Sequence, residues 1–139
     1  MRAMVISFVL VAVGGAVGAM ARLAMSLLLQ RAILIVPLGT FASNVTGCFV
    51  MGIVLQLLAT ADWFDKADLV SDQNRLLFAV GFCGSFTTLS SLVVEMHTLM
   101  QRQEIVPAFV YLFATMLGGF ACFYAGAALT RTLMQPHAG

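Results

Sequence analysis

The run IVPAFVYLFATMLGGFACFYAGAALT, residues 105–130, contains no charged residue and decides the fold. A helix needs roughly 20 apolar residues to cross the hydrocarbon core of a bilayer, and this run meets that length. Three further uncharged runs precede it, at residues 3–21, 32–61 and 76–94. The sequence therefore predicts four membrane-spanning segments that fill nearly the whole chain.

The overall composition supports the same interpretation. Hydrophobic residues make up 61% of the chain and charged residues 9%, whereas a soluble domain carries roughly 25% charged residues. Backbone groups must be hydrogen-bonded inside a bilayer, so only helices or closed barrels span it. The runs are too long and continuous for barrel strands of about 10 alternating residues. We therefore predict an all-α integral membrane protein, with residues 1–139 forming a single domain.

The first run admits one alternative interpretation. Arg2, the apolar stretch behind it and Ala19-Met20-Ala21 follow the order of a signal peptide with a cleavage site. Three more spans follow, however, and the glycines in this run suit a helix packed closely against another. A membrane span is therefore the favoured interpretation.

The charges that flank the spans give almost no orientation bias. With four spans, one face of the membrane holds Arg2, Lys66, Arg75 and Arg131, and the opposite face holds Arg22, Arg31 and Arg102. Cytoplasmic loops normally carry an excess of Lys and Arg, and here the two faces are nearly balanced. Two explanations stay open: a weak topology signal, or insertion in both orientations with head-to-tail pairing of copies. The net charge of +1 gives no reason to expect nucleic acid as a partner.

Small residues recur at four-residue intervals in two of the spans. They are Gly14 and Gly18 in the first span, and Ala114, Gly118, Cys122 and Gly126 in the fourth. Such stripes let membrane helices approach closely, within one subunit (the favoured interpretation) or between subunits. The three cysteines have no metal-binding spacing and are predicted to be packing residues. They are Cys48, Cys83 and Cys122.

Polar side chains inside the spans fall on shared helix faces. These groups are Thr40, Ser43, Asn44 and Gly47 in the second span, Ser91 and Glu95 in the third, and Tyr111 and Thr115 in the fourth. Polar groups are costly in lipid, so such tracks mark candidate ion or substrate pathways. Two alternatives stay open: Asn44 forming a structural hydrogen bond between helices, and Glu95 reaching to the membrane surface.

The segment GFCGSFTTLSSL, residues 81–92, lies in the middle of the third span. Its two glycines and its hydroxyl and β-branched residues make a poor helix interior. Free carbonyls at a break in a membrane helix commonly coordinate a cation. We therefore predict that the third helix is broken in mid-membrane; a kinked but continuous helix is the alternative. The predicted break comprises Gly84, Ser85, Phe86, Thr87 and Thr88.

Taken together, these motifs resemble the Fluc (CrcB) family of bacterial fluoride channels. The matching pieces are Gly14-Gly15-x-x-Gly18-x-x-x-Arg22, Pro37-x-Gly39-Thr40-x-x-x-Asn44-x-x-Gly47, Gly81-x-x-Gly84-x-x-Thr87-Thr88-x-Ser90, and Tyr111. Each motif is weak alone, but they occur in order across all four spans.

The resemblance implies an antiparallel, dual-topology homodimer in the bacterial plasma membrane, with two fluoride pathways along the subunit interface. It implies a structural sodium ion (Na+) at the dimer axis, held by the backbone carbonyls of Gly84 and Thr87 from both subunits. The fluoride pathway would comprise Asn44, Thr40, Ser91, Tyr111, Thr115 and Glu95. Arg22 is expected to have a structural role. Transport would be passive and would confer fluoride resistance.

The third span departs from the family pattern. Members usually carry Thr-Thr-Phe-Ser-Thr-Phe where this chain has TTLSSL, so Leu89 and Leu92 replace two phenylalanines of the pore wall. An aromatic edge is partly positive and favours an anion, whereas a leucine does not. The alternatives are a non-conducting partner subunit, paired with a paralogous chain, and a small dual-topology drug transporter. The first span lacks the acidic residue that such a transporter needs, and no residue pattern points to an enzyme.

Overall fold

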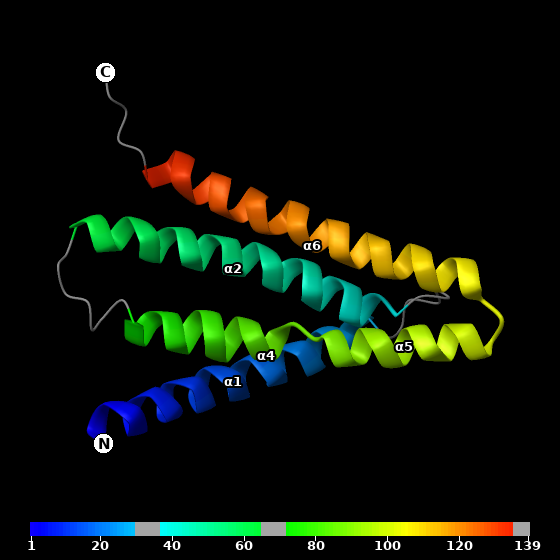
Figure 1. Ribbon diagram of the computed structural model, residues 1–139, viewed down its shortest axis with the longest axis horizontal. Coiled ribbons are helices and arrows are strands. Elements are labelled where there is room, and N and C mark those ends of the chain that lie inside the picture. The colour runs from blue at the N-terminus through cyan, green and yellow to red at the C-terminus, as the bar shows by residue number, and fades with distance from the viewer. Residues whose placement is uncertain (30–36, 65–71, 135–139) are drawn as a thin grey trace.

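The computed structural model describes residues 1–29, 37–64 and 72–134. Four of its helical segments are long and apolar enough to cross a membrane, which confirms the predicted spans. They are Arg2–Leu29, Leu38–Thr60, Asp72–Gln101 and Ile105–Met134. Consecutive spans run in opposite directions, and the start of the first lies at the same end of the bundle as the end of the fourth (Figure 1). Arg31 and Lys66, two of the charges used to predict orientation, lie outside the described residues.

The first span, α1 (Arg2–Leu29), packs against the first part of the third span, η1 (Arg75–Cys83). Gly14 and Gly18 are buried in this contact. A Cβ atom at either position would overlap a backbone carbonyl of the third span, that of Leu77 or of Phe82 respectively. The two glycines therefore permit a backbone-to-backbone approach within one chain, as the small-residue pattern predicts.

The second span, α2 (Leu38–Phe64), and the fourth, α6 (Ile105–Met134), lie side by side and run in the same direction (Figure 1). Gly52 of α2 faces the Phe123 carbonyl, and Gly126 of α6 faces the Phe49 carbonyl. Both positions leave no room for a side chain. This close pairing fixes the register of α2 against α6 and thereby the relative heights of their polar residues.

The third span changes conformation three times. After the π-helical turns of η1 it forms a short α-helical piece, α4 (Gly84–Phe86), and then two extended residues, Thr87 and Thr88. Their φ and ψ angles are −80° and 154° for Thr87, and −152° and 119° for Thr88. Helix α5 (Leu89–Gln101) then begins. The Thr88 hydroxyl caps α5 by accepting the N–H of Ser91 at 3.2 Å.

The interruption is narrower than the predicted break. Gly84, Ser85 and Phe86 remain helical, and only Thr87 and Thr88 are extended. The N–H of Gly84 bonds to the carbonyls of Ala79 and Gly81, so the wide preceding turns run into α4 without a gap. The weak helix propensity of this region is thus expressed as π-helical turns followed by a two-residue break.

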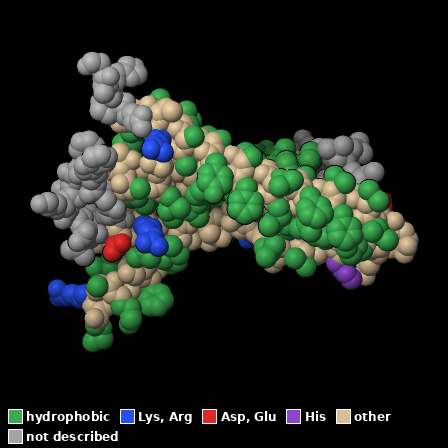
Figure 2. Space-filling model, turned by 45° about the horizontal axis from the view of Figure 1, so that its top comes forward, with side chains coloured by type: hydrophobic (Ala, Val, Ile, Leu, Met, Phe, Trp, Pro, Cys, Tyr) green, Lys and Arg blue, Asp and Glu red, His purple; other side chains and the backbone are tan. Residues whose placement is uncertain are grey.

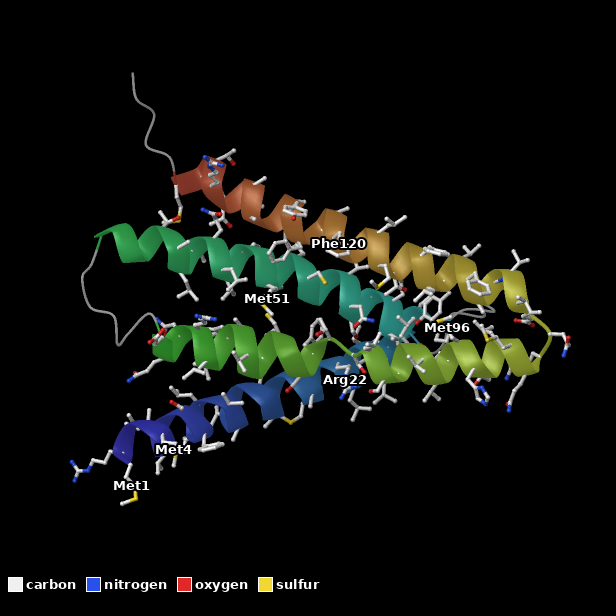
Figure 3. The ribbon with its side chains drawn as sticks, in the orientation of Figure 1. Met1, Met4, Arg22, Met51, Met96 and Phe120 are labelled. Carbon is white, nitrogen blue, oxygen red and sulfur yellow. The ribbon has the colours of Figure 1, made fainter. Side chains whose placement is uncertain are left out.

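Most apolar side chains point away from the bundle. The face seen in Figure 2 shows hydrophobic side chains along its length, while most of the charged side chains in view lie at one end. One buried apolar cluster, made by α5 and α6, comprises Leu92, Leu99, Ala108 and Tyr111. Met96 packs against it from α5, in the space between α5 and α6 (Figure 3). An apolar exterior with a small buried core is what a chain dissolved in lipid requires.

Candidate functional site

The amide of Asn44, on α2, bridges the interruption in the third span. Its Nδ2 donates a hydrogen bond to the Thr88 carbonyl at 3.1 Å. Its Oδ1 accepts the Thr88 N–H at 2.7 Å. One side chain thus satisfies both backbone groups of an extended residue inside an apolar bundle, where an unpaired group would cost about 1–3 kcal/mol. The structural hydrogen bond predicted as one alternative for Asn44 is present, and no residue of the described ranges accepts the second hydrogen of its Nδ2.

Asn44 and Thr88 also line a groove of about 460 Å³ between α2, the interruption, α5 and α6. The polar groups of this groove belong to Asn44, Thr87, Thr88 and Thr115 and to the hydroxyl of Tyr124, whose ring is part of the apolar wall. Its apolar wall includes Leu89, Leu92, Phe120, Phe123 and Tyr124. The groove therefore combines a few fixed polar groups with a mostly apolar lining, the pattern expected of a selective small-ligand path.

A second polar cluster joins α2, α5 and α6 around the Glu95 carboxylate. The Thr40 hydroxyl donates to Glu95 Oε1 at 2.6 Å, and the Tyr111 hydroxyl donates to Glu95 Oε2 at 2.7 Å. Tyr111 Oη also lies 3.3 Å from the Pro37 carbonyl oxygen. Each carboxylate oxygen thus receives a hydroxyl donor, so Glu95 points into the bundle and does not reach for the membrane surface. Hydrogen bonds to a carboxylate are stronger than those between neutral groups.

Two predicted pathway hydroxyls are engaged within their own segments. Thr115 Oγ1 donates to the Tyr111 carbonyl one turn earlier, at 2.8 Å. Ser91 Oγ accepts the Thr88 hydroxyl at 3.2 Å. Ser91 also lines a smaller hollow with Ser90, Val94 and Glu95. The structure therefore brings Ser91 beside Glu95, and Thr115 into the groove that contains Asn44.

The two leucines in place of aromatic residues have different environments. Leu89 is 67% exposed and offers its side chain to the groove. Leu92 is 2% exposed and belongs to the buried cluster with Tyr111, although it borders the groove as well. Leu89 is thus the leucine with free surface along the predicted pore wall.

The remaining predicted residues lie around the interruption. Gly84 is exposed. In a continuous helix its carbonyl would accept the N–H of Thr88, but here the Thr88 N–H donates to Asn44 Oδ1 instead. Thr87 donates its N–H and its hydroxyl to the Cys83 carbonyl. Arg22 is half-buried on α1 and is drawn near the level of the α4–α5 junction in Figure 3. Within the described ranges, no group of three His, Cys, Asp or Glu side chains is arranged to hold a metal ion.

The aromatic wall of the groove was not predicted. Phe120, Phe123 and Tyr124 follow Thr115 on α6. The signal for them was the helical period: positions 115, 116, 119, 120, 123 and 124 share one face of the helix. Extending the polar face of Thr115 along α6 would have identified the three aromatic residues.

Comparison with known proteins adds a family. The family described as "CrcB-like protein, Camphor Resistance (CrcB)" matches residues 9–127. A protein of Chlorobium phaeobacteroides (strain BS1) named fluoride-specific ion channel FluC is 40% identical over 125 residues, covering 90% of this chain and 93% of the relative. A protein of Gloeothece citriformis (strain PCC 7424) with the same name is 33% identical over 127 residues, covering 91% and 98%. The chain therefore belongs to the CrcB family, and its relatives include proteins named fluoride-specific ion channel FluC.

Proposed function

We propose that the protein is a fluoride-selective channel that lets fluoride leave the cell passively. The names of its relatives support this proposal. The observation that supports it most strongly is the position of the Asn44 amide. Two hydrogen bonds to Thr88 fix this amide beside the groove, and its second N–H has no acceptor among the described residues. A fixed donor in an apolar setting suits an anion that must lose its water.

Selectivity for fluoride follows from the size and hydration of the ion. Fluoride is small and strongly hydrated, so a path must replace its water with close, preorganised donors. Asn44 supplies an amide hydrogen. The hydroxyls of Thr40 and Tyr111 are two further donors, and in the structure both donate to Glu95. A narrow apolar wall that includes Leu89 disfavours the larger chloride ion.

The active form is proposed to be an antiparallel homodimer with two pores at the subunit interface, in the plasma membrane of a bacterium. The nearly balanced flanking charges support insertion in both orientations. A structural sodium ion at the dimer axis would be held by the carbonyls of Gly84 and Thr87 from both copies. The loss of the helical donor to the Gly84 carbonyl supports this assignment, because Na+ prefers oxygen ligands. The ion would supply positive charge where carbonyl dipoles from two chains meet.

A second candidate function is that of a partner subunit that conducts only with a paralogous chain. Leu89 favours it, because an aliphatic side chain on the groove lacks the partly positive edge of an aromatic ring. A drug transporter is less well supported, since α1 contains no acidic residue.

Growth on fluoride separates the channel from the partner subunit. The chain would be expressed in a bacterium that lacks its own fluoride channel, and growth would be followed at rising fluoride concentrations. Restored growth with this chain alone supports the homodimeric channel. Growth that is restored only when a second family member is co-expressed supports the partner subunit.

A further inference from the structure

Tyr124 carries a polar hydroxyl on a surface of α6 that lies well inside the membrane-spanning part of the helix. It lies on α6 (Ile105–Met134), about 7 Å along the axis from the midpoint of that helix at 1.5 Å per residue. The hydrocarbon core extends roughly 15 Å to either side of the bilayer centre. Tyrosines that anchor helices lie at the membrane–water interfaces. An interfacial anchor therefore does not account for Tyr124.

The two tyrosines of the chain differ in how their hydroxyls are satisfied. Tyr111 is 2% exposed, and its O–H is paired with Glu95. Tyr124 is 67% exposed, and its O–H makes no hydrogen bond to any residue in the described part of the chain. A hydroxyl in an apolar medium without a partner costs about 1–3 kcal/mol. At this depth the hydroxyl is stabilised by any partner that it meets, and no residue of the described ranges supplies one.

The place where that partner would sit is the groove. Tyr124 lines the same groove as Asn44, beyond Asn44 in the direction in which α2 and α6 both run. The register of α2 against α6 is given by Gly119, where a Cβ would lie 3.3 Å from Cys48 Sγ. Past this level the wall consists of Phe120, Phe123 and Tyr124. The Tyr124 hydroxyl is the donor of that aromatic stretch.

The surrounding rings suit a negative ion. The rings of Phe123 and Tyr124 are 5.5 Å apart and meet edge to face at 85°. The edge of an aromatic ring carries partial positive charge, whereas a cation prefers the ring face. A phenol hydroxyl next to aromatic rings therefore offers a small anion one strong donor, and the neighbouring rings have edges of the favourable sign.

We propose that Tyr124 donates its hydroxyl to the permeating anion and forms a second anion position in the groove, beyond Asn44. This inference rests on the proposed function, because it assigns a further residue to the same pathway. An anion released by the Asn44 amide would pass to the Tyr124 hydroxyl without returning to water. The α6 aromatic wall would thereby provide the anion-favouring edges that Leu89 does not.

The test removes the hydroxyl and keeps the ring. Tyr124→Phe and the control Phe113→Leu would be purified and reconstituted in liposomes loaded with fluoride; Phe113 is 58% exposed on α6 and does not line the groove. Fluoride efflux would be followed with an ion-selective electrode, and fluoride binding to the purified proteins by calorimetry. Tyr124→Phe is expected to lower efflux about tenfold or more, as loss of a hydrogen bond to an ion does. The control is expected to match the wild type.

The possible results separate this inference from the proposed function. If Tyr124→Phe and the wild type show the same fluoride efflux and the same fluoride binding, the proposed role of Tyr124 is wrong. The proposed channel function is then unaffected. Unchanged efflux with weakened self-association assigns the hydroxyl to a second copy and likewise overturns the role of Tyr124. A wild type that neither conducts nor binds fluoride overturns both proposals, since no anion is then present for Tyr124 to hold.

Discussion

Replacing Asn44 by Asp probes the donor at the interruption with almost no change in shape. The aspartate keeps an oxygen where Oδ1 now accepts the Thr88 N–H at 2.7 Å. Its other oxygen replaces Nδ2, which now donates to the Thr88 carbonyl at 3.1 Å, so two acceptors would face each other. The substitution also removes the amide hydrogen that is available to the groove. We therefore expect slower fluoride passage and a less stable break.

The size of the effect can be worked out from two contributions. Losing the bond to the Thr88 carbonyl and leaving that group unpaired costs about 1–3 kcal/mol of stability. An ionised carboxylate about 4 Å from a fluoride ion repels it by about 4 kcal/mol at an effective dielectric constant near 20. That energy corresponds to roughly a thousandfold in an equilibrium or rate constant. Repulsion therefore dominates the loss of flux, and the expected decrease is at least about a hundredfold.

The assay is fluoride efflux from liposomes at neutral pH, with unfolding of the purified protein measured in parallel. Asn74→Asp is the matched control, because it makes the same chemical change at the start of the third span, where Asn74 makes no capping side-chain hydrogen bond. The control is expected to conduct like the wild type. A folded Asn44→Asp protein with wild-type efflux would refute the assignment of Asn44 to the pathway.

Three further predictions follow from the packing and the charges. Thr40→Val and Tyr111→Phe each remove one hydrogen-bond donor from Glu95. Each is expected to lower the free energy of unfolding, measured by denaturation in detergent, by about 1.5–3 kcal/mol. Variants as stable as the wild type would show that the cluster around Glu95 is not formed. Gly18→Ala brings a Cβ against the Phe82 carbonyl and should cost about 1–3 kcal/mol. Gly118→Ala should cost less, because its Cβ would meet side-chain atoms and no backbone: one of Val45 at 3.3 Å and one of Phe41 at 3.9 Å. Tags at the C-terminus are expected on both faces of the membrane, and a tag found on one face alone would exclude dual insertion.

The fold was predictable because each span is both long and uncharged. The polar tracks were predictable in part, because helical spacing alone places Ser91 beside Glu95 and Tyr111 beside Thr115. Spacing within one helix does not show which side chains of a neighbouring helix will face it. The pairing of Glu95 with donors from two other helices therefore came only from the packing of α2 and α6 against α5.

Helix propensity predicted that the third span is interrupted, but not where the interruption begins and ends. Glycines and hydroxyl residues predicted a break over five positions, yet α4 stays helical and only Thr87 and Thr88 are extended. The exact site depends on Asn44, 44 residues earlier in the chain, which bonds to both backbone groups of Thr88. A hydrogen-bonding partner so far away in the sequence outweighs local helix preferences. The start of the extended segment therefore could not be predicted from the residues around it.

This chain by itself is proposed to form a path for fluoride that excludes chloride. The most direct measurement uses the purified wild-type protein in liposomes loaded with equal concentrations of both anions, and follows each with its own electrode after a potassium ionophore is added. We expect rapid loss of fluoride while chloride is retained. Retention of fluoride, or loss of both anions together, would contradict this proposal.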